Sequence, residues 1–252
     1  MADKVSIKWV EETDSTQDEV RRHISEYDNL SVVAAEFQTA GRGQRGNRWL
    51  AGRGENLTFS FPVKFGGDGF PPLLASRQFL ITQAVTVGVA SYLEHKGISC
   101  SIKWPNDIYV RDKKICGMLI ENSLDGNFLS RSIVGIGLNV NQKVFPPQLV
   151  NPVSMGLLTG EPYDTRAELG LLMERLVASL AFLSGGKDLS VLDSEYERRL
   201  YRKNVFHEYT ICADGSHIEA KIVGVSPSGR LRTENRKGEL MEFAFKEISY
   251  II

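Results

Sequence analysis

Four short segments rich in β-branched residues follow one another in the middle of this sequence, and turn-forming residues separate them. They lie, in order, at residues 100–104, 107–110, 114–122 and 132–140. Residues 111–113 (Arg-Asp-Lys) and 125–126 (Asp-Gly) are the expected hairpin turns. Strands joined by turns this short pair with their neighbours, so the middle of the chain is predicted to form a sheet.

Further strands and helices surround this region. Apolar and β-branched residues predict three more strands, at residues 5–10, 31–37 and 56–63. Apolar runs and helical periodicity predict three helices, at residues 74–95, 166–183 and 190–203. The first of these should end at Gly97, because glycine readily takes the left-handed conformation that closes a helix. These elements predict an α+β body.

A short additional helix is predicted to begin after Asp14. Ser15 and Thr16 are each followed by an acidic residue three positions later, which is a doubled capping-box signal. Val20, Ile24 and Tyr27 then follow at i, i+4 and i+7. One face of this helix is therefore expected to be apolar.

The composition excludes several classes of protein. Hydrophobic residues make up 42% and charged residues 24% of the 252 residues, and the formal net charge is −1. No overall positive field would therefore attract nucleic acid or an anionic membrane. The weakly polar stretch at residues 78–93 is too short to span a bilayer, and the N-terminal residues have no signal-peptide pattern. Three scattered cysteines and four scattered histidines show neither a disulfide framework nor metal-ligand spacing, which predicts a cytoplasmic protein.

The character of the chain changes near residue 208. Short strand-like segments follow one another there without a helix signal, and turn pairs interrupt them at residues 214–215, 228–229 and 237–238. Closely spaced strands of this kind suggest a small β-barrel. We therefore expect two domains, at residues 1–204 and 205–252.

A glycine-rich loop contains Gly41, Gly43 and Gly46 in the pattern G-x-G-x-x-G. The same pattern marks dinucleotide-binding folds, in which a helix begins within the glycines and its N-terminus holds the pyrophosphate. Here the following residues, 47–56, contain two more glycines and no helical periodicity, and no acidic residue stands about 20 positions later. The sequence therefore argues against a dinucleotide fold.

Arginines give this loop a second property. Arg42, Arg45, Arg48 and Arg53 lie in a stretch without an acidic residue. Their guanidinium groups would repel one another unless an anion, such as a phosphate or a carboxylate, relieved the repulsion. A solvated basic loop is the alternative, but the large indole of Trp49 favours a loop that orders over a polyanionic ligand.

A second group of residues follows at 103–121. Pro105 cannot donate a backbone hydrogen bond, so Asn106 and Asp107 are expected at a corner between strands. Lys114 begins a mostly apolar strand, and a cation there calls for an anionic partner. Glycine inside a strand marks either a bulge or a close approach, and three glycines near this lysine favour a pocket floor. These glycines are Gly117, Gly135 and Gly137.

Together these motifs resemble the catalytic core of biotin protein ligases. The matching segments, in the order and spacing of that family, are residues 14–16 (DST), 38–49 (QTAGRGQRGNRW), 103–107 (KWPND), 113–121 (KKICGMLIE) and 135–140 (GIGLNV). The resemblance implies a mixed β-sheet backed by helices, like that of class II synthetases, followed by a small SH3-like barrel. It implies an enzyme that activates biotin with ATP to biotinyl-5′-AMP in the presence of Mg²⁺. The biotin then passes to a lysine of a biotin carboxyl carrier domain.

The resemblance also implies roles for individual residues. Arg42, Lys114 and Lys103 would be catalytic, although Lys103 could equally be a surface charge. The biotin site would comprise Ser15, Thr16, Gln17, Gln38, Gly41, Arg42, Lys114, Gly117, Leu119, Gly135 and Gly137. The nucleotide site would comprise Arg42, Gln44, Arg45, Trp49, Asn106, Lys114 and Asn139. Asn106 and Asp107 would be the Mg²⁺ candidates, with Asp107 either binding the metal or bracing the corner.

Two positions depart from the pattern of many relatives. Gln17 stands where they have asparagine, and Gln44 stands where they have arginine. The second change removes one positive charge, so we expect the adenylate to be retained less tightly. Some relatives carry an N-terminal DNA-binding domain. Here the first predicted strand begins near residue 5, so we expect a ligase without that domain and without a nucleic-acid partner.

Three alternatives remain open. A lipoate or octanoate ligase or transferase shares a similar core, and a regulatory protein could bind a biotin-like molecule without turnover. Relatives occur as monomers or as sheet-paired dimers, so a homodimer is also open.

Overall fold

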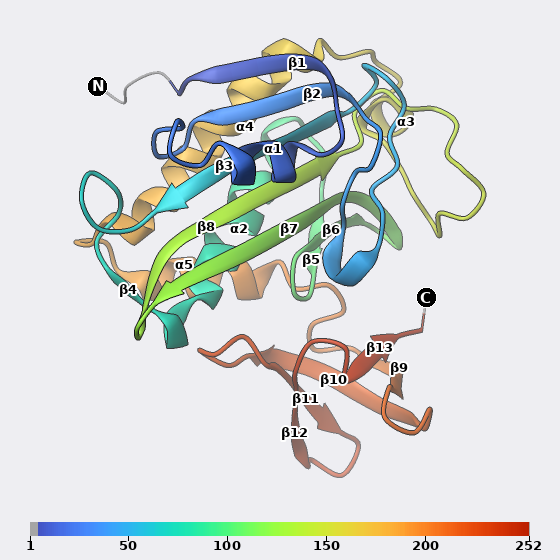
Figure 1. The fold of residues 1–252 in the computed structure, drawn as a ribbon. Coiled ribbons are helices and arrows are strands. Elements are labelled where there is room, and N and C mark those ends of the chain that lie inside the picture. Colours follow the sequence, from blue (N-terminus) through green and yellow to red (C-terminus); the bar gives the residue numbers. More distant parts are fainter. Residues whose placement is uncertain (1–4, 252) are drawn as a thin grey trace.

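The protein consists of a large mixed sheet with helices on both faces and a second, smaller sheet beside its lower edge (Figure 1). A computed structural model describes residues 5–251, apart from the side chain of Arg45. None of the helices formed by these residues combines the length and the apolar character that crossing a bilayer requires. The predicted α+β class is confirmed.

The large sheet has eight strands within the described part of the chain. Its main path runs through β1 (Ile7–Thr13), β2 (Val32–Gln38), β3 (Leu57–Lys64), β8 (Phe128–Leu138), β7 (Lys113–Asp125), β6 (Asp107–Val110) and β5 (Ser101–Lys103). The short β4 (Leu73–Leu74) pairs with β8 beside this path. β1 and β2 are parallel, and the other pairs are antiparallel. The four strands predicted in the middle of the sequence are therefore neighbours, as their short turns require.

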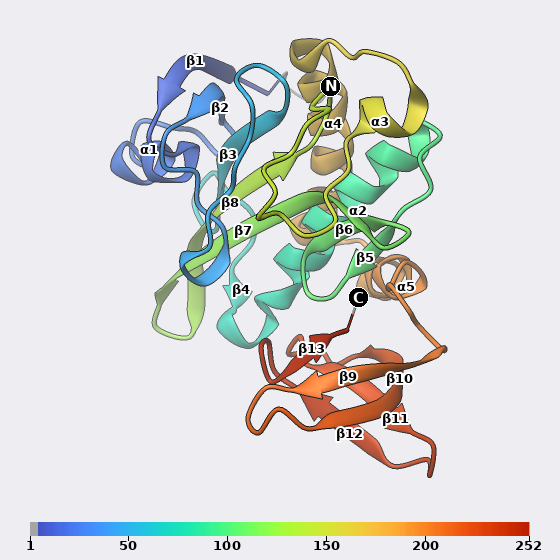
Figure 2. The same ribbon diagram turned by 90° about the vertical axis from the view of Figure 1, so that its right-hand side faces the viewer.

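Helices cover the two faces of the sheet unequally. One face carries the short α1 (Thr16–Arg22), and the other carries the longer helices, as the two views show (Figures 1 and 2). These are α2 (Phe79–His95), α4 (Thr165–Leu180) and α5 (Leu189–Arg198). The short α3 (Met155–Thr159) and the 3₁₀ turns at Gln44–Gly46, Ala75–Arg77 and Ala181–Ser184 complete the helical elements.

The alternation of side chains along the strands decides which face each residue covers. Phe59 and Phe61 are fully buried in the main core with Ile81 of α2. Val33 of β2 and Ile133 of β8 point to the opposite face and pack in a separate small cluster with Val20 of α1. The sheet thus has a thick core on one side and a partly open face beside α1.

Two predicted helix ends behave differently. Gly97 closes α2 as predicted, with a φ of 74° and a hydrogen bond of 3.0 Å from its N–H to the carbonyl of Glu94. At the start of α1 the predicted capping box is wrong, because Ser15 occupies the N-cap but its side chain accepts no capping hydrogen bond. α1 also ends at Arg22, although Ile24 and Tyr27 still pack on the Val20 cluster.

The C-terminal segment forms a separate antiparallel sheet, which Figure 2 shows below the large one. Its order is β12 (Leu240–Phe243), β11 (Leu231–Asn235), β10 (His217–Val225), β9 (Phe206–Ile211) and β13 (Ile248–Tyr250). The predicted small β unit is therefore present, and within the described residues β12 and β13 are its two edges, so the sheet is not closed into a barrel. The bridge between Phe245 and Ile248 is local to the turn before β13, and the N–H of Cys212 donates a 2.9 Å hydrogen bond to the carbonyl of Glu247. Neither contact joins β12 to β13.

Aromatic side chains join the second sheet to the β5–β6 corner of the first. The indole N–H of Trp104 donates a 3.0 Å hydrogen bond to the carbonyl of Gly229. The rings of Trp104 and Phe245 meet edge to face at 6.0 Å, and those of Tyr201 and Tyr250 lie 5.9 Å apart. These contacts hold β13 and the turn before it close to the corner that contains Asn106.

Candidate active site

A cavity of about 600 Å³ lies on the α1 face of the large sheet. Its lining comes from the start of α1, the glycine-rich loop, the strands β7 and β8 and the corner at residues 103–107. Gln38 of β2, Phe59 and Ser60 of β3 and residues of the second sheet, including β13, complete it. The predicted site residues that line it are Ser15, Thr16, Gln17, Gln38, Arg42, Gln44, Trp49, Lys103, Asn106, Asp107, Lys114, Gly117, Leu119, Gly135 and Gly137. Most of the predicted residues therefore share one cavity.

The floor of the cavity follows from the register of β7 and β8. Gly117 lies opposite Gly137, and Leu119 lies opposite Gly135. Residues two apart on a strand point to the same face, so these positions share the α1 face with Ile133. Between Lys114 and Leu119 the floor extends roughly 16 Å along β7, since a strand rises about 3.3 Å per residue.

The indole of Trp49 covers part of this floor. A Cβ atom on Gly137 would lie 2.2 Å from Cε2 of Trp49, and one on Gly117 would lie 3.0 Å from its Cζ3. The two glycines therefore make room for the indole, not for an open face toward a ligand. The sequence predicted a close approach at these glycines but not that Trp49 would make it.

Four polar residues line the cavity beside Gly135. The backbone N–H of Thr16 donates a 2.8 Å hydrogen bond to Oε1 of Gln38, and the Thr16 hydroxyl lies 2.8 Å from that of Ser60. Gln17 approaches Gly135 so closely that a Cβ atom there would be 2.5 Å from its Oε1. The Thr16 hydroxyl thus contacts side chains of β2 and β3.

Three buried polar atoms around the cavity have no hydrogen-bond partner within the described residues: Oγ of Ser15, Oε1 of Gln17 and Nε1 of Trp49. Leaving such a group unsatisfied costs about 1–3 kcal/mol, so buried polar groups are normally paired. Two of these residues, Ser15 and Gln17, are only 1% and 3% exposed. The cavity is therefore prepared for a ligand that both donates and accepts hydrogen bonds.

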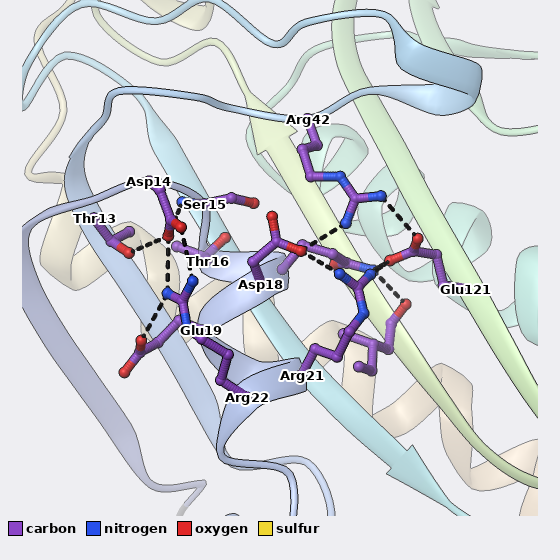
Figure 3. Close-up of polar contacts among 12 residues, drawn as sticks. Thr13, Asp14, Ser15, Thr16, Asp18, Glu19, Arg21, Arg22, Arg42 and Glu121 are labelled. Atoms are coloured by element: carbon purple, nitrogen blue, oxygen red, sulfur yellow. Dashed lines mark hydrogen bonds and ion pairs between the residues drawn. The ribbon is translucent and has the colours of Figure 1, made fainter.

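Arg42 is engaged in a charged network at the edge of the cavity (Figure 3). Its guanidinium lies 2.8 Å from Oδ1 of Asp18 and 3.1 Å from Oε1 of Glu121, and Arg21 contacts both carboxylates. Nε2 of Gln17 also donates to Glu121, at 2.8 Å. Arg42 thus lines the cavity, and carboxylates from α1 and β7 form ion pairs with its guanidinium group.

The predicted repulsion within the arginine loop is largely relieved by the protein itself. Arg53 pairs with Glu12, and Arg48 donates a 3.0 Å hydrogen bond to the carbonyl of Thr39. Carboxylates and a carbonyl group of the protein itself thus contact Arg42, Arg53 and Arg48. The partners come from distant strands and from α1, so the loop sequence could not reveal them. The Arg45 side chain lies outside the described part of the structure.

Lysines line the end of the cavity near the β5–β6 corner. Nζ of Lys114 lies 2.8 Å from Oδ1 of Asp107 and 5.9 Å from the ring centroid of Trp49. Nζ of Lys103 lies 3.3 Å from the hydroxyl of Tyr109 and 5.0 Å from the ring centroid of Tyr250. Burial of the Lys103 ammonium group lowers its pKa below that of a free lysine. Lys103 is therefore a half-buried cavity residue.

The remaining predicted residues have structural contacts. Nδ2 of the buried Asn106 donates a 2.7 Å hydrogen bond to the carbonyl of Met118. Asn139 is not among the residues that line the cavity, and its Nδ2 donates to the carbonyl of Val153 at 3.0 Å. Gly41 also lies outside the lining and accepts a 2.9 Å hydrogen bond from the N–H of Trp49.

Metal-binding side chains are few here. In residues 5–251 no three His, Cys, Asp or Glu side chains cluster in a way that could hold a metal ion. Asp107 is the carboxylate among the lining residues, and Lys114 pairs with it. Asp107 thus braces the corner in this structure.

Sequence reasoning missed the contribution of the second sheet. Its lining residues are Cys212, Phe245, Lys246, Ile248, Ser249 and Tyr250. The nearest of them, Cys212, lies 75 residues beyond Gly137, the last of the other lining residues in the sequence. No local pattern marks them, since only the packing of the two sheets brings them to the cavity.

The fold and the cavity define a protein with a small-molecule-sized cavity on a mixed sheet, lined by hydrogen-bonding groups and cations. The sequence model of the Biotin/lipoate A/B protein ligase family matches residues 9–139, and the chain belongs to this family. The matched region contains the glycine-rich loop, the 103–107 corner and the β7–β8 floor.

Individual relatives point to the biotin branch of the family. The bifunctional ligase/repressor BirA of Bacillus subtilis is 35% identical over 139 residues, which cover 53% of this chain and 41% of that protein. The biotin–protein ligase of Homo sapiens is 31% identical over 224 residues, covering 83% of this chain and 29% of that protein. The chain thus matches less than half the length of these curated relatives.

A solved structure matches over nearly the whole length of both chains. The biotin protein ligase from Aquifex aeolicus in complex with biotin and ATP superposes with a TM-score of 0.75 at 27% identity, covering 97% of each chain. The mixed sheet backed by helices is therefore that of biotin protein ligases, as the sequence motifs predicted.

Proposed function

We propose that this chain is a biotin protein ligase that forms biotinyl-5′-AMP from biotin and ATP and transfers the biotin to a lysine of a biotin carboxyl carrier domain. One observation carries the proposal. A single cavity combines unpaired buried hydrogen-bonding atoms near Gly135 with lysines near the 103–107 corner. An uncharged polar ring and a polyphosphate can bind side by side in such a cavity.

The cyclic urea of biotin suits the first group of atoms. Its carbonyl oxygen can accept a hydrogen bond from the hydroxyl of Ser15, and a ring N–H can donate to Oε1 of Gln17. Leu119 and the indole of Trp49, which rests on the glycines of the floor, offer an apolar surface to the rest of the ring system and the tail. Lipoate has no urea, so it would leave these atoms unpaired.

The first chemical step joins two anions. An oxygen of the biotin carboxylate attacks the α-phosphorus of ATP, the bond from that phosphorus to the bridging oxygen breaks, and pyrophosphate leaves. Because both reactants are negative, the protein must screen their repulsion. Lys114 and Arg42 are the groups we assign to this role, and Arg42 would then exchange Asp18 or Glu121 for the ligand.

The second step needs no nucleophile from this chain. The neutral amine of the carrier lysine attacks the acyl carbon of biotinyl-5′-AMP, an amide bond forms, and AMP and a proton are released. The protein therefore contributes positioning and exclusion of water. The indole of Trp49, which already covers the floor, is suited to close over the adenylate.

Mg²⁺ fits the chemistry of the cavity only together with the substrate. Mg²⁺ commonly binds one or two carboxylates plus substrate phosphates and waters. Asn106 and Asp107 are the residues of this chain that would hold it, and the ion would neutralise phosphate charge. We propose further that residues 1–204 and 205–252 act as two domains of a cytoplasmic enzyme that binds no nucleic acid.

Incubation of the protein with ATP, Mg²⁺ and either biotin or lipoate tests the function. We expect pyrophosphate and a mass equal to biotinyl-5′-AMP with biotin and neither product with lipoate. Addition of a carrier domain should then give a biotinylated lysine. A lipoyl-AMP product would instead identify a lipoate ligase, and biotin binding without pyrophosphate would identify a protein that binds without turnover.

Gln44→Arg should slow the release of biotinyl-5′-AMP by about tenfold, because a hydrogen bond to a charged group is worth about 1.5 kcal/mol more than a neutral one. Gln44 lines the cavity, so an arginine there can reach the adenylate phosphate. The control is Gln148→Arg, which adds the same charge on an exposed loop outside the lining. Equal release rates for all three proteins would reject the expectation.

A further inference from the structure

The turn that joins β12 to β13 is held in one conformation. The N–H of Glu247 donates a 3.0 Å hydrogen bond to the carbonyl of Ala244, which closes a four-residue turn. In return the carboxylate of Glu247 accepts a 2.6 Å hydrogen bond from the N–H of Ala244 and pairs with Arg230 at 3.1 Å. The residues between them are therefore fixed.

Lys246 occupies the third position of this turn in the left-handed backbone region, with a φ of 71°. A residue at this position of a type II turn is normally glycine or asparagine, because a Cβ atom is strained there. Residues held in such conformations concentrate at functional sites. A lysine in this strained position therefore suggests that its side chain has a function.

Lys246 lies at the margin of the cavity. Lys246 is among the lining residues although it belongs to the second sheet, and it is exposed. Among the described residues it makes no hydrogen bond or ion pair, whereas Arg42 and Lys114 both have carboxylate partners. It is a cation without a counter-charge at the margin of the proposed active site.

Neighbouring contacts place Lys246 at the lysine-rich end. Phe245 packs on Trp104, which directly follows Lys103 in the chain. Tyr250 of the same segment contacts Lys103 with its ring, at 5.0 Å from Nζ. The turn therefore faces the corner at residues 103–107 and not the urea-binding atoms near Gly135.

We propose that Lys246 binds the β- and γ-phosphates of the nucleoside triphosphate, so that the second sheet supplies part of the polyphosphate site. The inference deepens the proposed function and rests on it. A terminal phosphate is the ligand group that best matches a strained, unpaired lysine beside two other lysines, since it carries multiple negative charge. The adenylate intermediate lacks these phosphates and would not need Lys246.

Lys246→Gly removes both the backbone strain of this position and the proposed phosphate contact, and the two effects can be measured separately. We expect the variant to melt about 1–3 °C higher, because glycine relieves the left-handed strain. We expect its affinity for ATP and for inorganic pyrophosphate, measured by titration calorimetry in low salt, to fall about five- to tenfold, while AMP binds as in the parent protein. Lys246→Arg should retain the affinity, and Lys237→Gly, at an exposed turn of the same sheet, should leave it unchanged.

ATP affinity unchanged in Lys246→Gly, or equal weakening of ATP and AMP, would overturn the inference. A variant that binds ATP normally but needs more carrier domain would also overturn it and assign Lys246 to the carrier. The proposed function fails separately, if the parent protein makes no biotinyl-5′-AMP. Pyrophosphate binding that depends on Lys246 would then still support the anion site.

Discussion

Lys114→Ala is expected to slow formation of biotinyl-5′-AMP by about two to three orders of magnitude, which is the usual cost of removing one group that stabilises transition-state charge. Lys114 is the first inward-facing residue of β7, it lines the cavity, and its ammonium group lies 2.8 Å from Asp107. Without it, carboxylate and triphosphate approach an end of the cavity that carries an unpaired Asp107. The rate of pyrophosphate release at saturating biotin and ATP measures the effect.

The adjacent Lys113 offers a matched control. It carries the same charge, is exposed at the start of β7 and does not line the cavity. Lys113→Ala should therefore keep a rate close to that of the parent protein. Melting curves show whether the loss of the Asp107 ion pair destabilises Lys114→Ala, so that a loss of rate is separated from a loss of folded protein. Comparable rates for the two variants would contradict the role of Lys114.

Gly137→Ala is expected to weaken binding of both substrates by a factor of about 5–150, which corresponds to the 1–3 kcal/mol typical of overpacking. The added methyl group would lie 2.2 Å from the rigid indole of Trp49, so the indole must leave the floor of the cavity. The glycine-rich loop would then lose the contact that holds it over β8. Titrations with biotin and ATP measure the affinity, and tryptophan fluorescence reports the displaced indole.

Gly170→Ala makes the same chemical change where nothing obstructs it. Gly170 lies inside α4, and no atom comes within 4 Å of an added Cβ. Alanine is favoured over glycine by about 0.5–1 kcal/mol in a helix, so this variant should be slightly more stable and bind normally. Normal binding by Gly137→Ala as well would show that the indole does not rest on this glycine.

The order of the elements could be predicted because it depends on local properties. Turns at residues 111–112 and 126–127 separate β6, β7 and β8, within one residue of the predicted turns at 111–113 and 125–126. Gly97 ends α2 because only the backbone freedom of glycine suits that position. The lack of pairing between the edge strands β12 and β13 could not be predicted, since closure of a small sheet depends on long-range pairing of its edge strands.

The sequence by itself determined which chemical groups are present and near which elements: the 103–107 corner, the glycines of β7 and β8, and the arginines of the loop. Tertiary structure alone decided what each group faces. It paired Arg42 with Asp18 and Glu121, laid Trp49 on Gly137, and brought Lys246 from the second sheet to the cavity. The physical reason is that backbone preferences act over a few residues, whereas ion pairs and packing form between segments that are close only after folding.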